Sequence, residues 1–480
     1  MARFRVVAAL SYLVLALASP ALAQSPAPPA PSAAGLDELR RELQQMRQQY
    51  DAALQQMRDS YESRLRDMDA RLKAAEAAAS APPTQPAPAT AATAPTPVTP
   101  PVLAGSASGT TPVGVPGSPG NPSANPGAFN PAIGVILDGK FASLGKDPGT
   151  YRIPGFQRGD SSTPIPDRGF SLGETEISFS SNIDQALYGS AIVSIERTGT
   201  VNVEEAYLQT TSLPYGFTLK AGRFFSGIGY LNEQHAHTWD FADAPLPYLA
   251  FLNQQLGDDG VQLRWLAPTD MFLEFGTELA RGDAWPAAGA SNRGVGTYSG
   301  FVHAGDDINE SSSFRTGLSY LHTKASNRTT DSDTFNGDDD TGIFDFVYKW
   351  APEGNPTETN FKLQGEYFLR RERGTFNARD YAGWQNGWYA QAVYQFMPRW
   401  RVGIRHDRVN AESVSSAFAG TVLDNLDATP KRYSIMTDYS TSEFGRFRLQ
   451  FTRDESRPQL DNQVILQYTV SLGAHGAHIF

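Results

Sequence analysis

The sequence predicts an all-β protein, a transmembrane antiparallel β-barrel of about sixteen strands. An α-helical coiled coil and a disordered linker are expected to precede the barrel. Three observations support this prediction. The chain opens with a pattern typical of export signals, and apolar residues then recur every three or four positions. From residue 132 onwards, short stretches alternate apolar and polar side chains and are separated by Gly, Asn and Asp.

Residues 1–23 have the pattern of a cleaved signal peptide. Arg3 and Arg5 precede an apolar run at residues 6–18, and residues 21–23 are a small-x-small cleavage site. The apolar run is shorter than the roughly 20 residues that span a bilayer, which disfavours the alternative of a membrane anchor. The chain contains no cysteine. Lipoprotein processing is therefore excluded, and export to an oxidising compartment is expected.

Residues 36–78, after a short linker at 24–35, have the pattern of a coiled coil. Leu, Met and Tyr recur at a/d spacing, with a stutter where Met57, Tyr61 and Leu65 follow one another at four-residue steps. One helix cannot bury so narrow an apolar stripe alone, so we expect self-association. The alternative is a monomeric charged helix packed against another surface. Residues 79–131 are rich in Pro and Ala and predict a disordered tether.

Residues 132–480 are expected to form the barrel. In residues 360–369 one face is apolar, whereas the other carries Lys362, Gln364 and Glu366. Long apolar faces that end in Tyr, Trp or Phe are typical of a lipid-facing band, because the inner face of a soluble barrel has to fit a small core. The expected strands begin near Ala132, Gly169, Gln185, Thr200, Gly216, Gly260, Asp270, Tyr298, Ser312, Gly342, Thr357, Gly387, Arg399, Lys431, Glu443 and Gln463.

Composition alone does not separate a soluble all-β protein from a membrane barrel. The mean hydropathy is −0.37, but each strand of a membrane barrel shows lipid only every second residue. The excess of 51 acidic over 40 basic residues argues against a nucleic-acid partner. No phosphate-cradling loop or His-Glu-x-x-His helix is present, and we predict neither an enzyme nor a cofactor. A barrel protease or lipase is the alternative.

The C-terminal segment predicts the location of the barrel. Val464, Leu466 and Tyr468 share one face of the last expected strand, and the same parity reaches Phe480. A final strand ending in Phe resembles the recognition signal of bacterial outer-membrane barrels. We therefore expect the outer membrane of a Gram-negative bacterium, with the coiled coil as a periplasmic extension. Lipid is then an expected partner, together with a homo-oligomer formed through coiled coil and barrel, and peptidoglycan is a possible contact.

Two motifs carry a family resemblance. Ala206-Tyr-Leu-Gln-Thr-Thr211 and Leu219-Lys-Ala-Gly-Arg-Phe-Phe-Ser-Gly-Ile-Gly229 resemble a strand pair of the phosphate-selective porin superfamily. Similar barrels that carry sequences like Gly473-Ala-His-Gly-Ala-His478 are labelled metal-regulated receptors or siderophore porins. The chain departs from energy-coupled receptors, because the region before the barrel offers no globular plug. The resemblance implies a porin-type channel.

Strand parity points several charged side chains into the barrel. The arginines expected to line the channel are Arg401, Arg405, Arg432, Arg446 and Arg448. The expected acidic side chains are Glu174, Glu176, Glu196, Glu274 and Glu278. Two patches of opposite charge on the wall would set up a transverse field that orients anionic or dipolar solutes. The alternative is that these charges simply neutralise one another.

Residues 227–260 form the longest interruption between expected strands in the first half of the barrel. The segment is bulky and apolar, so we expect it to fold inwards and constrict the pore; an external flap or a subunit contact is the alternative. His235 and His237 are weak metal candidates, since a strand would place both on one face. The terminal His475 and His478 are weaker still. Residues 331–340 predict an acidic extracellular loop rather than a calcium site.

The function expected from the sequence is passive uptake of small hydrophilic, chiefly anionic, solutes through an outer-membrane channel. Two alternatives stay open. One is a substrate-specific uptake barrel for a metal or metal–siderophore complex, with the His-containing insertion as its binding element. The other is an envelope tether in which the rod contacts peptidoglycan and the barrel serves as an anchor.

Overall fold

The computed structural model describes residues 131–159, 165–173, 175–195, 199–288 and 294–473. The predictions for the signal peptide, the short linker, the coiled coil and residues 79–130 lie outside the described residues. Those for Glu174, Glu196, His475, His478 and Phe480 do so as well. In the described part of the chain, no helix is long and apolar enough to cross a bilayer.

The described residues are almost entirely β-strand. The strands are β1 (Ala132–Leu144), β2 (Gly169–Leu172), β3 (Thr175–Asn182), β4 (Leu187–Ile195), β5 (Val201–Thr210), β6 (Phe217–Phe225), β7 (Gly257–Leu266), β8 (Phe272–Ala280), β9 (Thr297–Asn309), β10 (Ser312–Thr330), β11 (Asp333–Trp350), β12 (Asn360–Phe376), β13 (Arg379–Met397), β14 (Trp400–Ala411), β15 (Lys431–Ser442), β16 (Gly445–Glu455) and β17 (Asp461–Gly473). One short helix, α2 (Leu246–Phe251), and a few 3-10 turns, among them η3 (Ala236–Thr238), lie between them.

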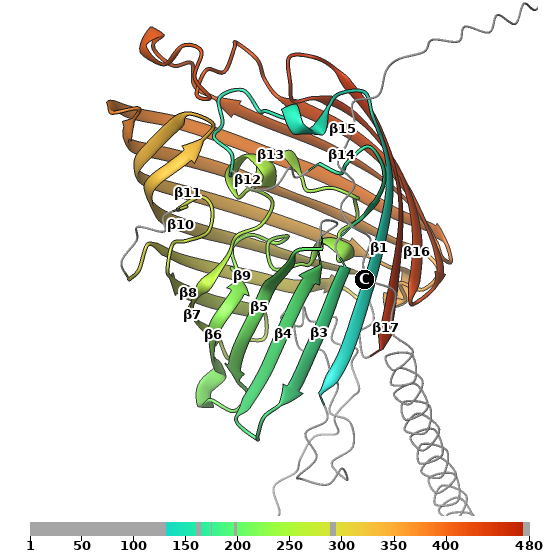
Figure 1. The fold of residues 1–480 in the computed structure, drawn as a ribbon. Helices are drawn as coiled ribbons and strands as arrows, with labels where there is room; N and C mark the ends of the chain where they lie inside the picture. Colours follow the sequence, from blue (N-terminus) through green and yellow to red (C-terminus); the bar gives the residue numbers. More distant parts are fainter. Residues whose placement is uncertain (1–130, 160–164, 174, 196–198, 289–293, 474–480) are drawn as a thin grey trace, which may run out of the picture. The chain divides into compact units, whose positions relative to one another are not determined.

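The strands form one closed antiparallel ladder (Figure 1). Consecutive strands pair with each other, and β1 pairs with β17 through registers such as Leu137↔Val470. β2 and β3 both pair with β1, through Gly139↔Leu172 and Ile136↔Glu176, so together they fill one strand position. The barrel therefore has sixteen strand positions, which confirms the predicted fold class for this part of the chain.

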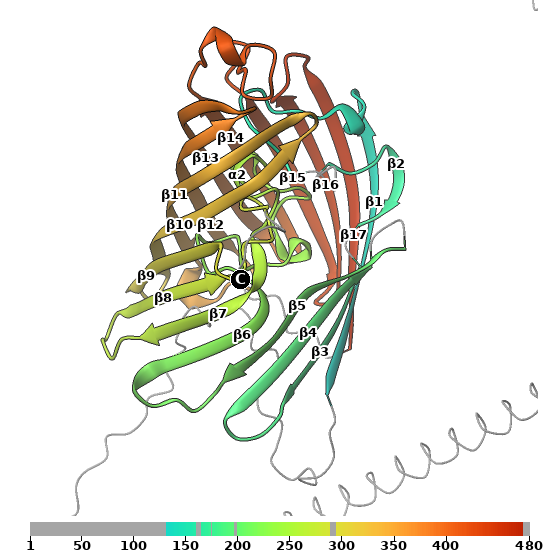
Figure 2. The ribbon, with the colours of Figure 1, turned by 60° about the vertical axis from the view of Figure 1, so that its left-hand side comes forward.

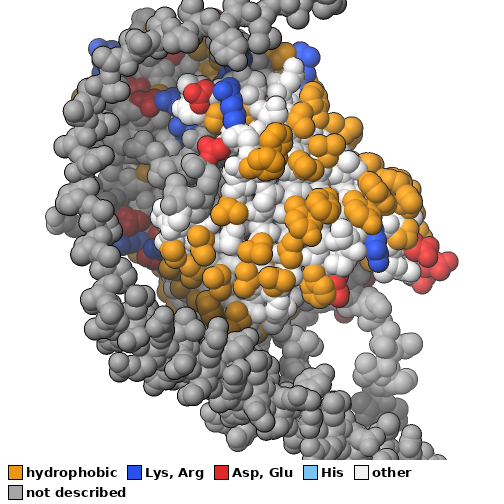
Figure 3. Space-filling model, turned by 45° about the vertical axis from the view of Figure 1, so that its right-hand side comes forward, with side chains coloured by type: hydrophobic (Ala, Val, Ile, Leu, Met, Phe, Trp, Pro, Cys, Tyr) orange, Lys and Arg blue, Asp and Glu red, His pale blue; other side chains and the backbone are white. Residues whose placement is uncertain are grey.

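The alternation of side chains along each strand separates an apolar outer face from a polar inner face. On β16, Phe447, Leu449 and Phe451 are exposed, whereas Arg448 and Gln450 are buried inside the barrel. Hydrophobic side chains spread over the outer wall in Figure 3. Aromatic pairs lie close to the strand ends that short turns connect, among them Phe447–Tyr468 and Trp400–Tyr439. The outer face thus has the apolar band and aromatic rim expected from the sequence.

The strands differ greatly in length. β10 to β13 have 17 to 19 residues, whereas β3 to β8 have 8 to 10. The predicted acidic loop at residues 331–340 is wrong, because β11 already begins at Asp333. Its acidic side chains have partners on neighbouring strands: Asp339 lies 3.6 Å from Arg328 and 3.5 Å from Arg370. The long strands also begin earlier than expected: β11 begins at Asp333 rather than near Gly342, and β13 begins at Arg379 rather than near Gly387.

Residues 169–173 have Gly-x-Ser-x-Gly spacing, which in some hydrolases marks a nucleophile on a sharp strand-to-helix turn. Here Gly169 to Leu172 form β2 and pair with β1 through Lys140↔Ser171. No helix follows Gly173, because the chain continues into β3. The segment therefore lacks the backbone geometry of a nucleophile elbow.

Candidate functional site

The insertion, residues 226–256 between β6 and β7, lies inside the barrel (Figure 2). All six residues of its helix α2 are buried, and the helix packs on β13 and β14. Phe251 stacks on Phe368 of β12 with ring centroids 5.5 Å apart. The apolar residues that sequence reasoning found unsuited to solvent thus form the core of the barrel interior, which confirms the expected inward fold.

Glu366 of β12 holds the middle of the insertion. Its carboxylate accepts hydrogen bonds from the backbone N–H groups of Tyr230 and Leu231, both at 3.1 Å. It also accepts from the hydroxyl of Tyr248 in α2, at 2.9 Å, and from that of Tyr389 on β13, at 2.7 Å. Two carboxylate oxygens offer about four acceptor sites, and these four donors use them.

Asp243 ties the insertion to the opposite strands. Its carboxylate lies 2.8 Å from Arg405 of β14 and 3.0 Å from Arg432 of β15, and it accepts from Gln450 of β16 at 2.7 Å. Burial alone would raise the pKa of Asp243, but the two guanidinium groups outweigh burial and lower that pKa to about 2. Asp243 is therefore an ionised carboxylate at neutral pH.

Asp240 is a second charged anchor of the insertion, and its partners lie near the first residues of β12 and β14. It contacts the ammonium of Lys362 and lies 3.0 Å from Arg401. Burial would raise the pKa of Asp240, but Lys362 and Arg401 hold it well below the usual range. Neither Asp240 nor Asp243 was singled out as an anchor from the sequence, because their partners lie more than a hundred residues away along the chain.

The five predicted arginines all face inwards, and the structure brings them together on β14, β15 and β16. Arg405 and Arg432 share Asp243 and Asp407, whereas Arg401 and Arg448 share Asp438. Arg446 instead donates to the backbone oxygen of His237 at 2.6 Å. Most of the arginine wall is thus paired, and its counter-charges are aspartates, not the glutamates of the alternative in which the two predicted sets neutralise one another.

The described glutamates of the prediction are also buried, on other strands. Glu278 of β8 accepts from Ser226 at 2.5 Å and from the backbone N–H of Gly227 at 2.8 Å. Glu274 lies 3.2 Å from His303 and 3.6 Å from Arg264. These side chains fix the start of the insertion and the wall of β7 to β9, apart from the arginine strands.

Three further cations were not singled out from the sequence as site residues. Lys349 and Lys362 lie directly opposite each other across the β11–β12 ladder, and Arg315 stands over the ring of Tyr230 at 5.0 Å. Like charges in register normally destabilise a sheet. All three lie within four residues of one end of the barrel, where short turns join β9 to β10, β13 to β14 and β15 to β16, and Arg401 and Arg446 lie at the same end. Their inward parity was the only signal available in the sequence.

The expected strand geometry for His235 and His237 is wrong. The two residues belong to the insertion, where His235 caps the 3-10 turn η3 and His237 lies within it. Their rings nevertheless stack with centroids 5.8 Å apart. The carboxylates nearest to these histidines in the sequence have other partners: Glu233 contacts Arg264, and Asp240 contacts Lys362. The carboxylates that approach the two rings come from β3 and β5.

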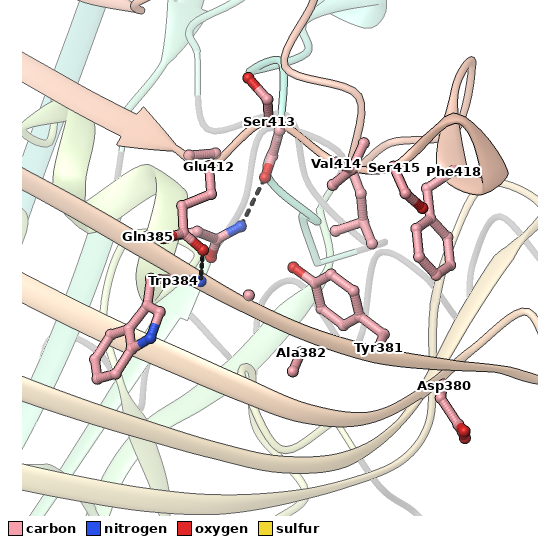
Figure 4. A pocket seen from close by; sticks show the side chains of 14 residues that line it. Asp380, Tyr381, Ala382, Trp384, Gln385, Glu412, Ser413, Val414, Ser415 and Phe418 are labelled. Carbon is pink, nitrogen blue, oxygen red and sulfur yellow. Dashed lines mark hydrogen bonds between the residues drawn. The ribbon is translucent and has the colours of Figure 1, made fainter.

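A small cleft of about 180 Å³ lies between β13 and the segment that joins β14 to β15 (Figure 4). Tyr381 and Phe418 face each other across it, with ring centroids 5.6 Å apart. Glu412 accepts from the backbone N–H of Trp384 at 3.1 Å. These contacts hold the joining segment against the long strands.

No protein-family model matches the chain. It is 31% identical over 387 residues to an uncharacterised protein of Aquifex aeolicus (strain VF5), covering 74% of this chain and 80% of the other. Among solved structures, an anion-selective porin from Comamonas acidovorans is 10% identical with a TM-score of 0.47 and covers 72% of this chain and 99% of its own. The channel DcaP of Acinetobacter baumannii is also 10% identical, with a TM-score of 0.45 and coverage of 72% and 97%.

Proposed function

We propose that this chain, which belongs to the same family as the uncharacterised Aquifex aeolicus protein, is a passive outer-membrane channel for small hydrophilic solutes with a preference for anions. The closed ladder with an apolar outer face and a charged inner face is the observation that carries this proposal. In a bilayer every backbone N–H and C=O needs a partner, and a closed barrel provides one for each strand. The export signal expected at residues 1–23 fits the same location.

The insertion supports a constricted path rather than a wide one. Its anchors at Glu366, Asp240 and Asp243 attach it to β12, β14 and β15. A segment held by buried charges at several points keeps its position while solutes pass. We propose that solutes move between this segment and the remaining wall.

A cluster of cations supports the anion preference. The cluster lies near the end of the barrel where short turns join β9 to β10, β13 to β14 and β15 to β16, whereas the other end carries the insertion and the long β14–β15 segment. Its members are Arg315, Lys349, Lys362, Arg401 and Arg446. The contacting carboxylates include Asp240, Asp345 and Asp438. In outer-membrane barrels the short turns face the periplasm. The cations would thus act on solutes at the periplasmic end of the path, where a positive field raises the local concentration of anions.

The remaining parts of the proposal concern the region before the barrel. We propose a cleaved signal peptide at 1–23, a linker at 24–35, a periplasmic coiled coil at 36–78 and a tether at 79–131. We also propose that the protein forms a homo-oligomer. We further propose that the coiled coil contacts peptidoglycan.

Recordings in planar lipid bilayers test the channel. Purified protein is expected to give an ohmic conductance, and a KCl gradient is expected to give a reversal potential on the anion-selective side. Arg446→Gln should move the reversal potential towards cation selectivity. Arg453→Gln, at an exposed position on the same strand, is the matched control and should leave it unchanged. Absence of conductance from folded protein overturns the channel, and a cation-selective wild type overturns the anion preference.

A further inference from the structure

A β-bulge on β5 turns two consecutive glutamates to the same face. Opposite β4, Ile192 pairs with Glu205 and Val193 pairs with Val203, so Glu204 is an extra residue in the ladder. Val203 is exposed on the outer wall, whereas Glu205 is buried and Glu204 mostly so. Regular alternation would send one of two adjacent side chains outwards. The bulge instead directs both carboxylates into the barrel, a role that bulges have beside functional sites.

His235 of the insertion meets these glutamates together with Glu176 of β3. Its Nδ1 lies 3.3 Å from Glu204 Oε2 and 3.5 Å from Glu176 Oε2, and the three atoms lie within 4.8 Å of one another. Both His235 Nδ1 and Glu204 Oε2 are buried, yet neither has a hydrogen-bond partner in the described part of the chain. A buried polar atom without a hydrogen bond destabilises the folded state, so the convergence of two such atoms requires an explanation.

The groups behind these three atoms hold them in position. Glu205 Oε2 lies 3.2 Å from His235 Nε2, and Glu205 is itself fixed by the backbone N–H of Phe225 at 3.1 Å. With the imidazole proton on Nε2, His235 donates to Glu205 and its Nδ1 lone pair faces Glu176 and Glu204. His237 Nδ1 lies 2.8 Å from Glu176 Oε1, which leaves Oε2 directed at the site. Carboxylates behind a ligating histidine, and donors behind a ligating carboxylate, are the usual outer partners of a metal site.

We propose that His235, Glu204 and Glu176 bind a divalent transition-metal cation such as Zn²⁺. Zinc bonds to nitrogen and oxygen are about 2.0–2.1 Å long, which places two tetrahedral ligands about 3.3 Å apart. The distances from His235 Nδ1 to the two carboxylates match that separation. An imidazole ligand favours a transition metal over Ca²⁺ or Mg²⁺, which prefer oxygen alone. A water molecule completes the shell.

The site has a mechanical role that goes beyond the proposed channel function. A cation at this position joins the insertion to β3 and β5, whereas Asp240 and Asp243 join it to β14 and β15. The insertion is then attached on two separate parts of the wall. Binding of the cation would tie the segment around His235 to β3 and β5, in addition to the hydrogen bonds that Glu278 and Glu366 make to the first half of the insertion.

Metal titration of the purified full-length chain tests the proposal. After treatment with a chelator, Zn²⁺ is added to the protein in detergent micelles and binding is followed by calorimetry. One Zn²⁺ per chain is expected at this site. His235→Gln and Glu204→Gln should each weaken its binding at least tenfold, and the outer variant Glu205→Gln should weaken it by about 10- to 100-fold. His322→Gln and the double variant His475→Gln, His478→Gln are the controls and should leave this site unchanged.

Cobalt provides a readout of the ligands themselves. Co²⁺ bound to the wild type should show the intense visible absorption of a tetrahedral site, and Glu204→Gln should abolish that absorption in a protein that still folds. Two outcomes overturn the proposal: wild type that binds neither Zn²⁺ nor Co²⁺, or binding that is lost only in the terminal-histidine variant. The first would identify the cluster as an imidazolium held by carboxylates. If His235→Gln fails to fold, Glu204→Gln and the wild-type cobalt spectrum decide the question.

Discussion

The carboxylate of Asp243 lies 2.8 Å from the guanidinium of Arg405, which joins residues 162 positions apart in the chain. Arg432 on the neighbouring strand contacts the other oxygen of the same carboxylate. Both arginines also donate to the backbone of the insertion, at the carbonyl oxygens of Asp243 and Ala244. Asp243 of the insertion and Asp407 of the wall therefore balance the charges of the two buried arginines together.

Removal of this carboxylate is expected to destabilise the protein strongly. Asp243→Asn leaves Arg405 and Arg432 with Asp407 as their remaining common carboxylate. Breaking a buried ion pair from one side typically costs about 3–5 kcal/mol. The free energy of unfolding, measured with guanidinium chloride in detergent micelles, should fall by that order. Asp270→Asn, at an exposed turn, is the control and should change it by less than about 0.5 kcal/mol.

The same side chain should make stability depend on pH in the acid range. The pKa of Asp243 is about 2 in the folded protein, against an ordinary value of 3.8. A depressed carboxyl pKa contributes stability that is fully present above the unfolded pKa and is lost as the pH falls through the folded pKa. The contribution is about 2 kcal/mol. The difference in unfolding free energy between wild type and Asp243→Asn should therefore narrow between about pH 4 and pH 2. The groups that face Asp243 are Arg405, Arg432 and Gln450, and Asp407 contacts the same two arginines. A constant difference across this range would contradict the assignment.

Tyr248 and Glu366 should behave as a coupled pair. The hydroxyl of Tyr248 donates to the carboxylate that also accepts two backbone N–H groups of the insertion. We expect Tyr248→Phe to cost about 1 kcal/mol, the usual net contribution of a hydrogen bond. A double-mutant cycle with Glu366→Gln should give a coupling energy above about 0.5 kcal/mol. Strictly additive unfolding energies would show that the hydroxyl does not hold the insertion through Glu366.

A charge on the apolar outer face should report the bilayer. Leu449 lies between Phe447 and Phe451 on the outer face of β16 and is 48% exposed. In a membrane, Leu449→Arg should cost about 2–4 kcal/mol, whereas arginine near the interface costs about 0–1 kcal/mol. Phe444→Arg, in the short turn before β16, is the matched control. Unfolding from lipid vesicles measures both variants, and equal costs would argue that this face does not contact hydrocarbon.

The strand series could be predicted because alternation is a local signal. Five residues of sequence are enough to show that Phe447, Leu449 and Phe451 share one face of a strand. The inward direction of Arg448 follows from the same alternation. The partners of the inward side chains follow from no such local pattern. Asp243 meets Arg405 only because the insertion crosses the barrel interior, and the spacing of neither residue indicates the other.

Two misreadings have definite physical causes. Parity counting cannot find Glu204 as an inward residue, because the bulge that redirects it is a feature of pairing between strands. The density of aspartates at residues 331–340 resembles a solvated loop, but Asp339 lies 3.6 Å from Arg328 and 3.5 Å from Arg370 on the neighbouring strands. Charged residues in a barrel interior are paired by neighbours on other strands, which a single stretch of sequence does not display.

Because the strands differ in length, the barrel wall is much taller on one side than on the other. At about 3.3 Å per residue and a tilt of 35–45°, the nine residues of β6 rise about 21–24 Å, close to the 25 Å height of an apolar band. The 19 residues of β10 rise about twice as far. The strands β3 to β8 are just long enough to cross the apolar band. Deletion of one residue from each of two neighbouring strands there would therefore pull their polar turns towards hydrocarbon. On the side of β10 to β13 the extra rungs stand clear of the lipid, and that rim is where evolution or an engineer is free to shorten, lengthen or decorate the barrel.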